Sequence, residues 1–188
     1  MSGSSSGSSP ARPREKVKET KEVGALRWLK VLLSTFFFTG YFPKCPGTAA
    51  SAAAFALIVI THLCTRQLIV PFFVAIVAVS IPFIVCLIIS IWLSPWALKY
   101  FEQSDPKQFV IDEAAGMFLV LVFVPPDFFA FLLAFTLFRI FDILKPWPIK
   151  RLEKLPPRFA LVADDLMAGI YTIACHLIVV VIFSLLPI

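Results

Sequence analysis

The sequence predicts an all-α, polytopic integral membrane protein with about four spanning helices and a short N-terminal interfacial helix. Hydrophobic residues make up 59% of the 188 residues, whereas an ordinary soluble domain is about 45–50% apolar. The mean hydropathy is +0.88. The charged residues, 15% of the chain, cluster between long apolar runs, so they mark loops and helix ends.

The N-terminal part of the chain differs from the rest. Residues 1–24 are rich in Ser and Gly and then alternate basic and acidic side chains, which is typical of a disordered tail. Residues 25–188 are expected to form one membrane domain. Within it, residues 26–38 carry Arg27 and Lys30 on an apolar stretch that is shorter than the roughly 20 residues of a spanning helix. An interfacial helix, inserted or not, is therefore expected there.

The apolar runs and the residues that interrupt them predict the other elements. Residues 48–65, which are uncharged and Ala-rich, predict a first span, and residues 67–93 predict a second one with a kink at Pro82. Residues 112–124 and 127–144 predict a helical hairpin that turns at Pro125-Pro126, and residues 164–186 predict a last span. Each arm of the hairpin is short for a full bilayer, so either a tilt or a position partly inside the protein is expected. A Pro/Gly loop at 40–48, a polar connection at 94–111 and a basic loop at 145–163 join these elements.

The basic residues predict the orientation in the membrane. The tail and the loop at 145–163 carry several Lys and Arg side chains, whereas the opposite side holds Arg66 and the turn at Pro125. The positive-inside rule therefore places the tail and the loops at 94–111 and 145–163 in the cytoplasm. The acidic residues near these loops are then expected at the cytoplasmic ends of their helices.

Five carboxylates at that face are the candidate catalytic and metal-binding residues: Asp112, Glu113, Asp142, Asp164 and Asp165. Carboxylates gathered at one depth repel one another, and oxygen ligands suit a hard divalent cation such as Mg²⁺ or Mn²⁺. Gly116 and Gly169 follow Asp112 and Asp165 by four residues, on the same helix face, where a glycine lets a neighbouring helix approach. Singly, each acid would be explained as a helix cap, but three clusters at one depth favour a metal site.

Basic residues beside these acids are candidate phosphate contacts. Arg139 and Lys145 flank Asp142 at helical spacing, and they offer a planar fork and a point charge respectively. The alternative is simple pairing with the acid and snorkelling of both side chains. The segment Pro46-Gly47-Thr48 precedes a predicted helix, and its free N–H groups would suit an anion. Lys44 is nearby, although an ordinary loop-to-helix turn is equally consistent.

Other catalytic groups have less support. His62 and His176 fall within predicted spans, away from the acids, which favours a packing role. The four cysteines show no metal-ligand spacing, and no basic, aromatic-rich stretch indicates nucleic-acid binding. Carboxylates together with basic residues suit metal-assisted attack of water on phosphorus.

Three motifs resemble those of a known family. They are IDEAAG at 111–116, FRIFDILKPWPI at 138–149 and DDLMAG at 164–169. In order and spacing, from about residue 29 to residue 186, the chain resembles the phosphatidylglycerophosphatase A family. The central motif is long and specific, so it carries most of the resemblance.

The resemblance implies a Mg²⁺-dependent phosphatase in residues 25–188. Such an enzyme is a multi-pass protein of the bacterial inner membrane with its active site facing the cytoplasm, and it hydrolyses phosphatidylglycerophosphate to phosphatidylglycerol. Its substrate is thus a phospholipid of the bilayer. The five acids would bind Mg²⁺, with one of them as a candidate general base instead, and Arg139, Lys145, Lys44 and Thr48 would hold the phosphate.

Two other functions remain as alternatives. An ion-coupled transporter would also use acids among broken helices, but it predicts carboxylates near mid-bilayer and a repeat of helices. A CDP-alcohol phosphotransferase predicts a longer Asp-rich motif, which this sequence lacks.

Overall fold

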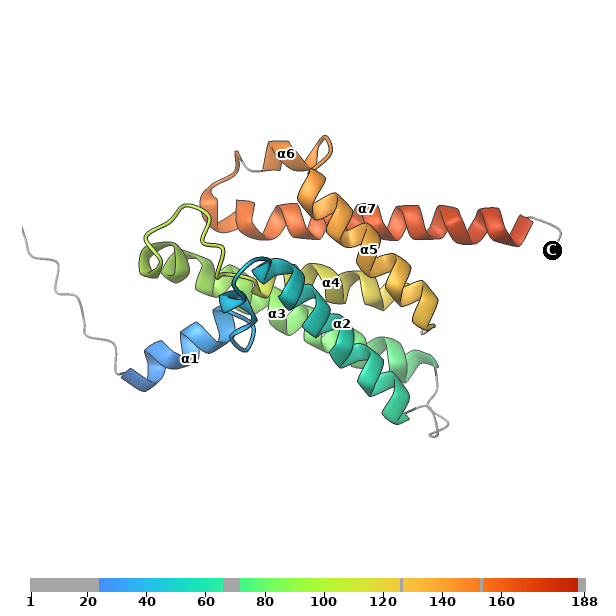
Figure 1. Ribbon diagram of the computed structural model, residues 1–188, viewed down its shortest axis with the longest axis horizontal. Helices are drawn as coiled ribbons and strands as arrows, with labels where there is room; N and C mark the ends of the chain where they lie inside the picture. The colour runs from blue at the N-terminus through green and yellow to red at the C-terminus, as the bar shows by residue number, and fades with distance from the viewer. Residues whose placement is uncertain (1–23, 66–71, 126, 153, 186–188) are drawn as a thin grey trace, which may run out of the picture.

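The computed structural model describes residues 24–65, 72–125, 127–152 and 154–185, and these contain helices and no strand. Figure 1 shows their arrangement. In chain order they are α1 (Gly24–Ser34), η1 (Thr39–Tyr41), α2 (Pro46–Thr65), α3 (Phe72–Tyr100), α4 (Ile111–Phe123), α5 (Phe128–Leu144), α6 (Ile149–Leu152) and α7 (Pro157–Leu185). The all-α prediction is therefore confirmed for the described residues. The tail predicted at 1–24, except for Gly24, and Arg66 lie outside them.

Three described helices are long and apolar enough to cross a membrane. The candidate spans are Pro46–Leu63 in α2, Ile76–Tyr100 in α3 and Arg158–Leu185 in α7. α4 and α5 have 13 and 17 residues, and at 1.5 Å per residue α4 measures about 20 Å against a hydrocarbon core of about 30 Å. The structure thus supports a helical membrane protein with three candidate spans among its described residues, rather than a definite count of four.

The short helix α4 is the centre of the fold. It packs against α2, α3, α5 and α7, and Figure 1 shows it among the longer helices. Met117, Phe118 and Val120 of α4 are at most 1% exposed, and Phe138 of α5 belongs to the same core. A helix that is apolar on all sides can be buried in protein as well as in lipid, so the apolar run at 112–124 reflects burial by neighbouring helices.

Several helix boundaries differ from the predicted ones. α3 continues through Pro95 to Tyr100, so the first part of the predicted polar connection is helical. α2 and α7 begin at Pro46 and Pro157, because a proline without an N–H fits the first turn of a helix. The start of α7 at Pro157 places Asp164 and Asp165 inside a helix rather than at its beginning, so a helix-capping role for these two acids is wrong.

The interfacial helix is also shorter than predicted. α1 ends at Ser34, and the chain then reverses through Phe36, Phe37 and Phe38, which have φ values of 41°, 56° and 67°. Trp28 of α1 is 61% exposed, as expected for an aromatic side chain at a membrane surface.

The orientation predicted from the basic loops can be tested by cysteine labelling. In a variant whose four native cysteines are replaced by Ser, a membrane-impermeant thiol reagent should label Lys150→Cys from the cytoplasm. It should label Phe128→Cys, at the start of α5, from the opposite side. Both positions are exposed. The reverse pattern would contradict the orientation.

Candidate active site

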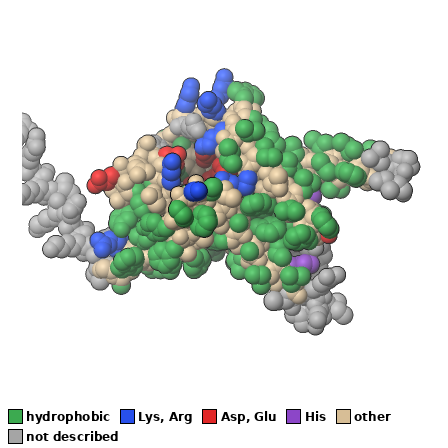
Figure 2. Space-filling view, viewed as in Figure 1, with side chains coloured by type: hydrophobic (Ala, Val, Ile, Leu, Met, Phe, Trp, Pro, Cys, Tyr) green, Lys and Arg blue, Asp and Glu red, His purple; other side chains and the backbone are tan. Residues whose placement is uncertain are grey.

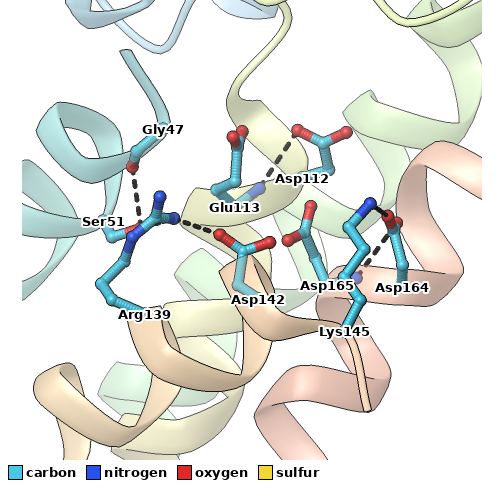
Figure 3. Close-up of polar contacts among 9 residues, drawn as sticks. All are labelled: Gly47, Ser51, Asp112, Glu113, Arg139, Asp142, Lys145, Asp164 and Asp165. Atoms are coloured by element: carbon cyan, nitrogen blue, oxygen red, sulfur yellow. Dashed lines mark hydrogen bonds and ion pairs between the residues drawn. The ribbon is translucent and has the colours of Figure 1, made fainter. Parts of the chain in front are cut away.

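Acidic residues from three helices meet at one end of the bundle. Asp112 and Glu113 lie in the first turn of α4, Asp142 lies near the end of α5, and Asp164 and Asp165 lie within α7. Figure 3 shows their side chains directed toward a shared space. Residues that are far apart in the sequence therefore form one acidic group.

Two glycines bring α4 and α7 together beneath this group. A Cβ atom on Gly116 would lie 2.9 Å from the backbone oxygen of Asp165 and 2.9 Å from the Phe138 ring, and a Cβ on Gly169 would lie 3.2 Å from the backbone oxygen of Gly116. The prediction that the two glycines permit close helix approach beside Asp112 and Asp165 is confirmed.

Three of the acids form a compact trio, namely Asp112, Glu113 and Asp165. Each offers a carboxylate oxygen, and these atoms all lie within 4.8 Å of one another. Asp112 is 3% exposed and Asp165 is 5% exposed. Asp112 Oδ1 accepts a hydrogen bond of 3.1 Å from the backbone N–H of Glu113, whereas Glu113 Oε2 is buried and no described residue bonds to it.

The two α4 carboxyls of the trio, which lie outside the candidate spans, are electrostatically costly. Burial raises the pKa of Asp112 well above its usual value, and the charge of Glu113 adds to this rise. Burial also raises the pKa of Glu113 to about 7. Buried like charges favour the neutral forms unless an opposite charge compensates them. The trio therefore requires bound protons or a cation.

The other two acids form ion pairs. Arg139 Nη1 lies 2.5 Å from Asp142 Oδ2, and Lys145 Nζ lies 2.6 Å from Asp164 Oδ2. Lys145 ends α5 in a left-handed conformation with φ 42°, and its N–H donates to the Phe141 oxygen. The helix end thus positions Lys145 beside α7. The Arg139–Asp142 contact is the pairing considered as an alternative above, and a role in phosphate binding remains a prediction.

A cavity of 370 Å³ joins these groups, and its size falls within the range of small-ligand sites. All nine predicted site residues line it: Lys44, Thr48, Asp112, Glu113, Arg139, Asp142, Lys145, Asp164 and Asp165. Figure 2 shows Lys and Arg side chains around the acids, with hydrophobic side chains over much of the remaining face. The two histidines do not line this cavity.

The structure adds two residues that the sequence interpretation missed, Ser51 and Lys107. Ser51 Oγ donates to the Gly47 oxygen at 2.9 Å and accepts a longer hydrogen bond, 3.4 Å, from Arg139 Nη1. Gly47 itself permits close contact, because a Cβ there would lie 2.2 Å from Glu113 Oε1. Lys107 lines the cavity from the loop before α4. The signals were weak: Ser51 shares a helix face with Gly47, and Lys107 lies in a polar connection.

Comparison with known proteins identifies the family. The family model described as phosphatidylglycerophosphatase A matches residues 32–180, which include all nine predicted site residues. The chain belongs to the phosphatidylglycerophosphatase A family. Membership of this family makes the chain a phosphatase, and the alternative of an ion-coupled transporter has no support in the comparisons.

Two of the similar proteins carry the name of this family. The chain is 34% identical to the Haemophilus influenzae protein named "Phosphatidylglycerophosphatase A", over 76% of this chain and 83% of that protein. It is 30% identical to the Escherichia coli protein of the same name, over 74% and 76% respectively. A Bacteroides thetaiotaomicron protein named "Putative phosphatidylinositol-3-phosphatase" is 29% identical over 77% and 89%. No solved structure gives a significant match.

Proposed function

We propose that this phosphatase removes the terminal phosphate of phosphatidylglycerophosphate to give phosphatidylglycerol, in phospholipid biosynthesis, with Mg²⁺ as cofactor. The observation that supports this most is the 370 Å³ cavity, which combines a largely buried carboxylate trio with Arg139 and Lys145. The names of the two relatives that share the family name supply the substrate.

The trio fits a divalent cation. Its donors are all carboxylate oxygens within 4.8 Å of one another, and the Glu113 Oε2 atom is buried without a partner among the described residues. Such an oxygen-only set suits Mg²⁺. When bound, the ion would neutralise these acids and supply Lewis-acid activation of the phosphate or of water. Asp142 and Asp164 complete the proposed set of catalytic and metal-binding acids.

Arg139 and Lys145 are the proposed phosphate contacts. Their side chains are 14% and 28% exposed, so both are partly shielded from water yet line the cavity. The phosphate oxygens would share these cations with Asp142 and Asp164, and the cations would stabilise charge that develops in the transition state. Lys44 and Thr48 extend the same phosphate contact from the beginning of α2. One of the acids accepts the proton of the attacking water.

The apolar helices suit a substrate that stays in the bilayer. Ile60 of α2 and Phe183 of α7 are 58% and 60% exposed, as lipid-facing side chains would be. We place the protein in the bacterial inner membrane with the cavity at the cytoplasmic face, because the basic loop at 145–163 satisfies the positive-inside rule there. The acyl chains then remain in lipid while the headgroup enters the cavity.

Metal removal tests this function directly. Purified protein should release phosphate from phosphatidylglycerophosphate in Mg²⁺, lose this activity in EDTA, and regain it when Mg²⁺ is restored, because the carboxylate trio needs a compensating cation. Phosphatidylinositol 3-phosphate and phosphatidic acid serve as comparison substrates in the same detergent micelles. Full activity after exhaustive dialysis against EDTA would exclude the metal mechanism.

The ion pair between Arg139 and Asp142 gives a second test. Arg139→Lys keeps the charge but loses the planar fork, so kcat/KM should fall by about 10²-fold, within the range seen when one preorganised donor is removed. Asp142→Asn should also lower activity. If the pair only steadies the end of α5, both variants should melt at lower temperature but keep nearly normal specific activity, so both quantities should be measured on the same samples.

A further inference from the structure

A second cavity adjoins the acidic one at Lys145. Its volume is 560 Å³, and the described residues that line it are Lys145, Trp147, Lys150, Arg151 and Lys154. Lys145 also lines the acidic cavity. Four of the five lining residues are therefore basic, and we name this second cavity the basic groove.

The basic groove is held by specific contacts. Ile149 of α6 is fully buried, and the Arg151 N–H donates to the Pro148 oxygen at 2.8 Å. The Tyr171 hydroxyl of α7 donates to the backbone oxygen of Trp147 at 3.1 Å. The Arg151 guanidinium lies 5.4 Å from the centre of the Trp147 ring. Trp147 and Arg151 are thus fixed relative to α7, which also carries Asp164 and Asp165.

The charge of the basic groove suits an anion. Lys150, Arg151 and Lys154 are all exposed, and like charges held together raise the local concentration of anions. The acid of this loop, Glu153, lies outside the described residues. Trp147 is 70% exposed, and a tryptophan beside basic side chains is typical of the level of lipid headgroups. Because the groove shares Lys145 with the acidic cavity, an anionic group next to a phosphate in that cavity would meet this groove.

We propose that the basic groove binds the phosphodiester of the same lipid whose terminal phosphate enters the acidic cavity. This proposal rests on the proposed function. Phosphatidylglycerophosphate carries a terminal monoester and, across one glycerol unit, a diester that joins it to the diacylglycerol. Because the two cavities meet at Lys145, one headgroup can occupy both. The groove therefore selects lipids that carry a diester as well as a terminal monoester.

Removing charge from the groove tests the proposal. The variant Lys150→Gln/Arg151→Gln is compared with Arg27→Gln/Lys99→Gln, which loses the same charge at exposed positions that line neither cavity. In micelles of neutral detergent, the groove variant should raise KM for phosphatidylglycerophosphate about tenfold, equivalent to about 1.4 kcal/mol of binding. Its kcat and melting temperature should stay unchanged, and the control variant should match the wild type.

Two inhibitors identify the group that is recognised. Phosphatidylglycerol carries only the diester, so its inhibition should weaken in the groove variant, whereas inhibition by phosphatidic acid, which carries only a monoester, should not. Unchanged KM, or equal weakening of both inhibitors, overturns the proposal. If KM of the groove variant rises only on vesicles with anionic lipid, the groove attracts the protein to the membrane surface, and this result also overturns the proposal.

Failure of the proposed function gives a different result. If the wild type hydrolyses another lipid monoester but not phosphatidylglycerophosphate in these micelles, the proposed substrate is wrong. The comparison of the two inhibitors, made with the lipid that is hydrolysed, still decides whether the groove recognises a diester.

Discussion

Asp165→Asn should abolish nearly all phosphatase activity without destabilising the protein. We expect kcat to fall by about 10³-fold, comparable to the largest effects of removing one preorganised electrostatic contact. The carboxamide keeps the size of the side chain but is a poorer ligand for a hard cation. Because Asp165 is 5% exposed and lies within the acidic trio, removing its charge also relieves repulsion between buried carboxylates.

Thermal unfolding distinguishes loss of the metal site from loss of the fold. In EDTA the melting temperature of Asp165→Asn should equal or exceed that of the wild type. Mg²⁺ should raise the melting temperature of the wild type, since a ligand that binds only the folded state stabilises it, and this increase should be much smaller in the variant. A normal Mg²⁺ response with normal activity would remove Asp165 from the site.

Asp127→Ala provides the matched control. Asp127 caps the start of α5, where its Oδ1 accepts hydrogen bonds of 2.9 Å and 3.0 Å from the N–H groups of Phe129 and Ala130. Losing this cap should cost about 1 kcal/mol of stability and leave specific activity unchanged. The two acids should therefore show opposite patterns: Asp165 affects activity without stability, and Asp127 affects stability without activity.

Which residues gather at the candidate site could largely be predicted, because their charges stand out locally in the sequence. The acid pairs at 112–113 and 164–165 and the group formed by Arg139, Asp142 and Lys145 are each visible as charged residues beside apolar runs. All nine predicted residues line one cavity. The division of the acids into a trio and two ion pairs could not be predicted, since it depends on how α4, α5 and α7 cross.

The number of membrane-spanning helices could not be predicted from the sequence, because it too depends on how the helices pack. A helix buried by other helices and a helix buried by lipid are both apolar on all sides. The apolar sequence of α4, which is 13 residues long, therefore does not by itself distinguish a span from a helix buried in protein. The early start of α7 is not evident from the sequence, because a proline such as Pro157 is also typical of a loop. A proline at the first helical position breaks no hydrogen bond, and residues 158–163 are mostly apolar.

Gly116→Val should damage the fold where α4 and α7 cross. Even a Cβ atom at this position would lie 2.9 Å from a backbone oxygen of α7 and 2.9 Å from the Phe138 ring. Backbone cannot rotate away as a flexible side chain can, so α4 and α7 must separate. Overpacking of this kind costs roughly 1–3 kcal/mol, occasionally more. Valine gains less than about 1 kcal/mol over glycine in helix propensity, so the substitution should destabilise the protein.

A graded series checks this explanation. Gly116→Ala should lower the melting temperature in detergent, and Gly116→Val should lower it further or prevent folding. Gly24→Ala is the control, because a Cβ there meets nothing within 4 Å. The folded fraction of the Gly116→Ala variant should also lose specific activity and bind Mg²⁺ more weakly. Separating α4 from α7 moves Asp112 and Glu113 away from Asp165. If Gly116→Val melts like the wild type, the close crossing that joins the acidic trio is not the arrangement of these helices.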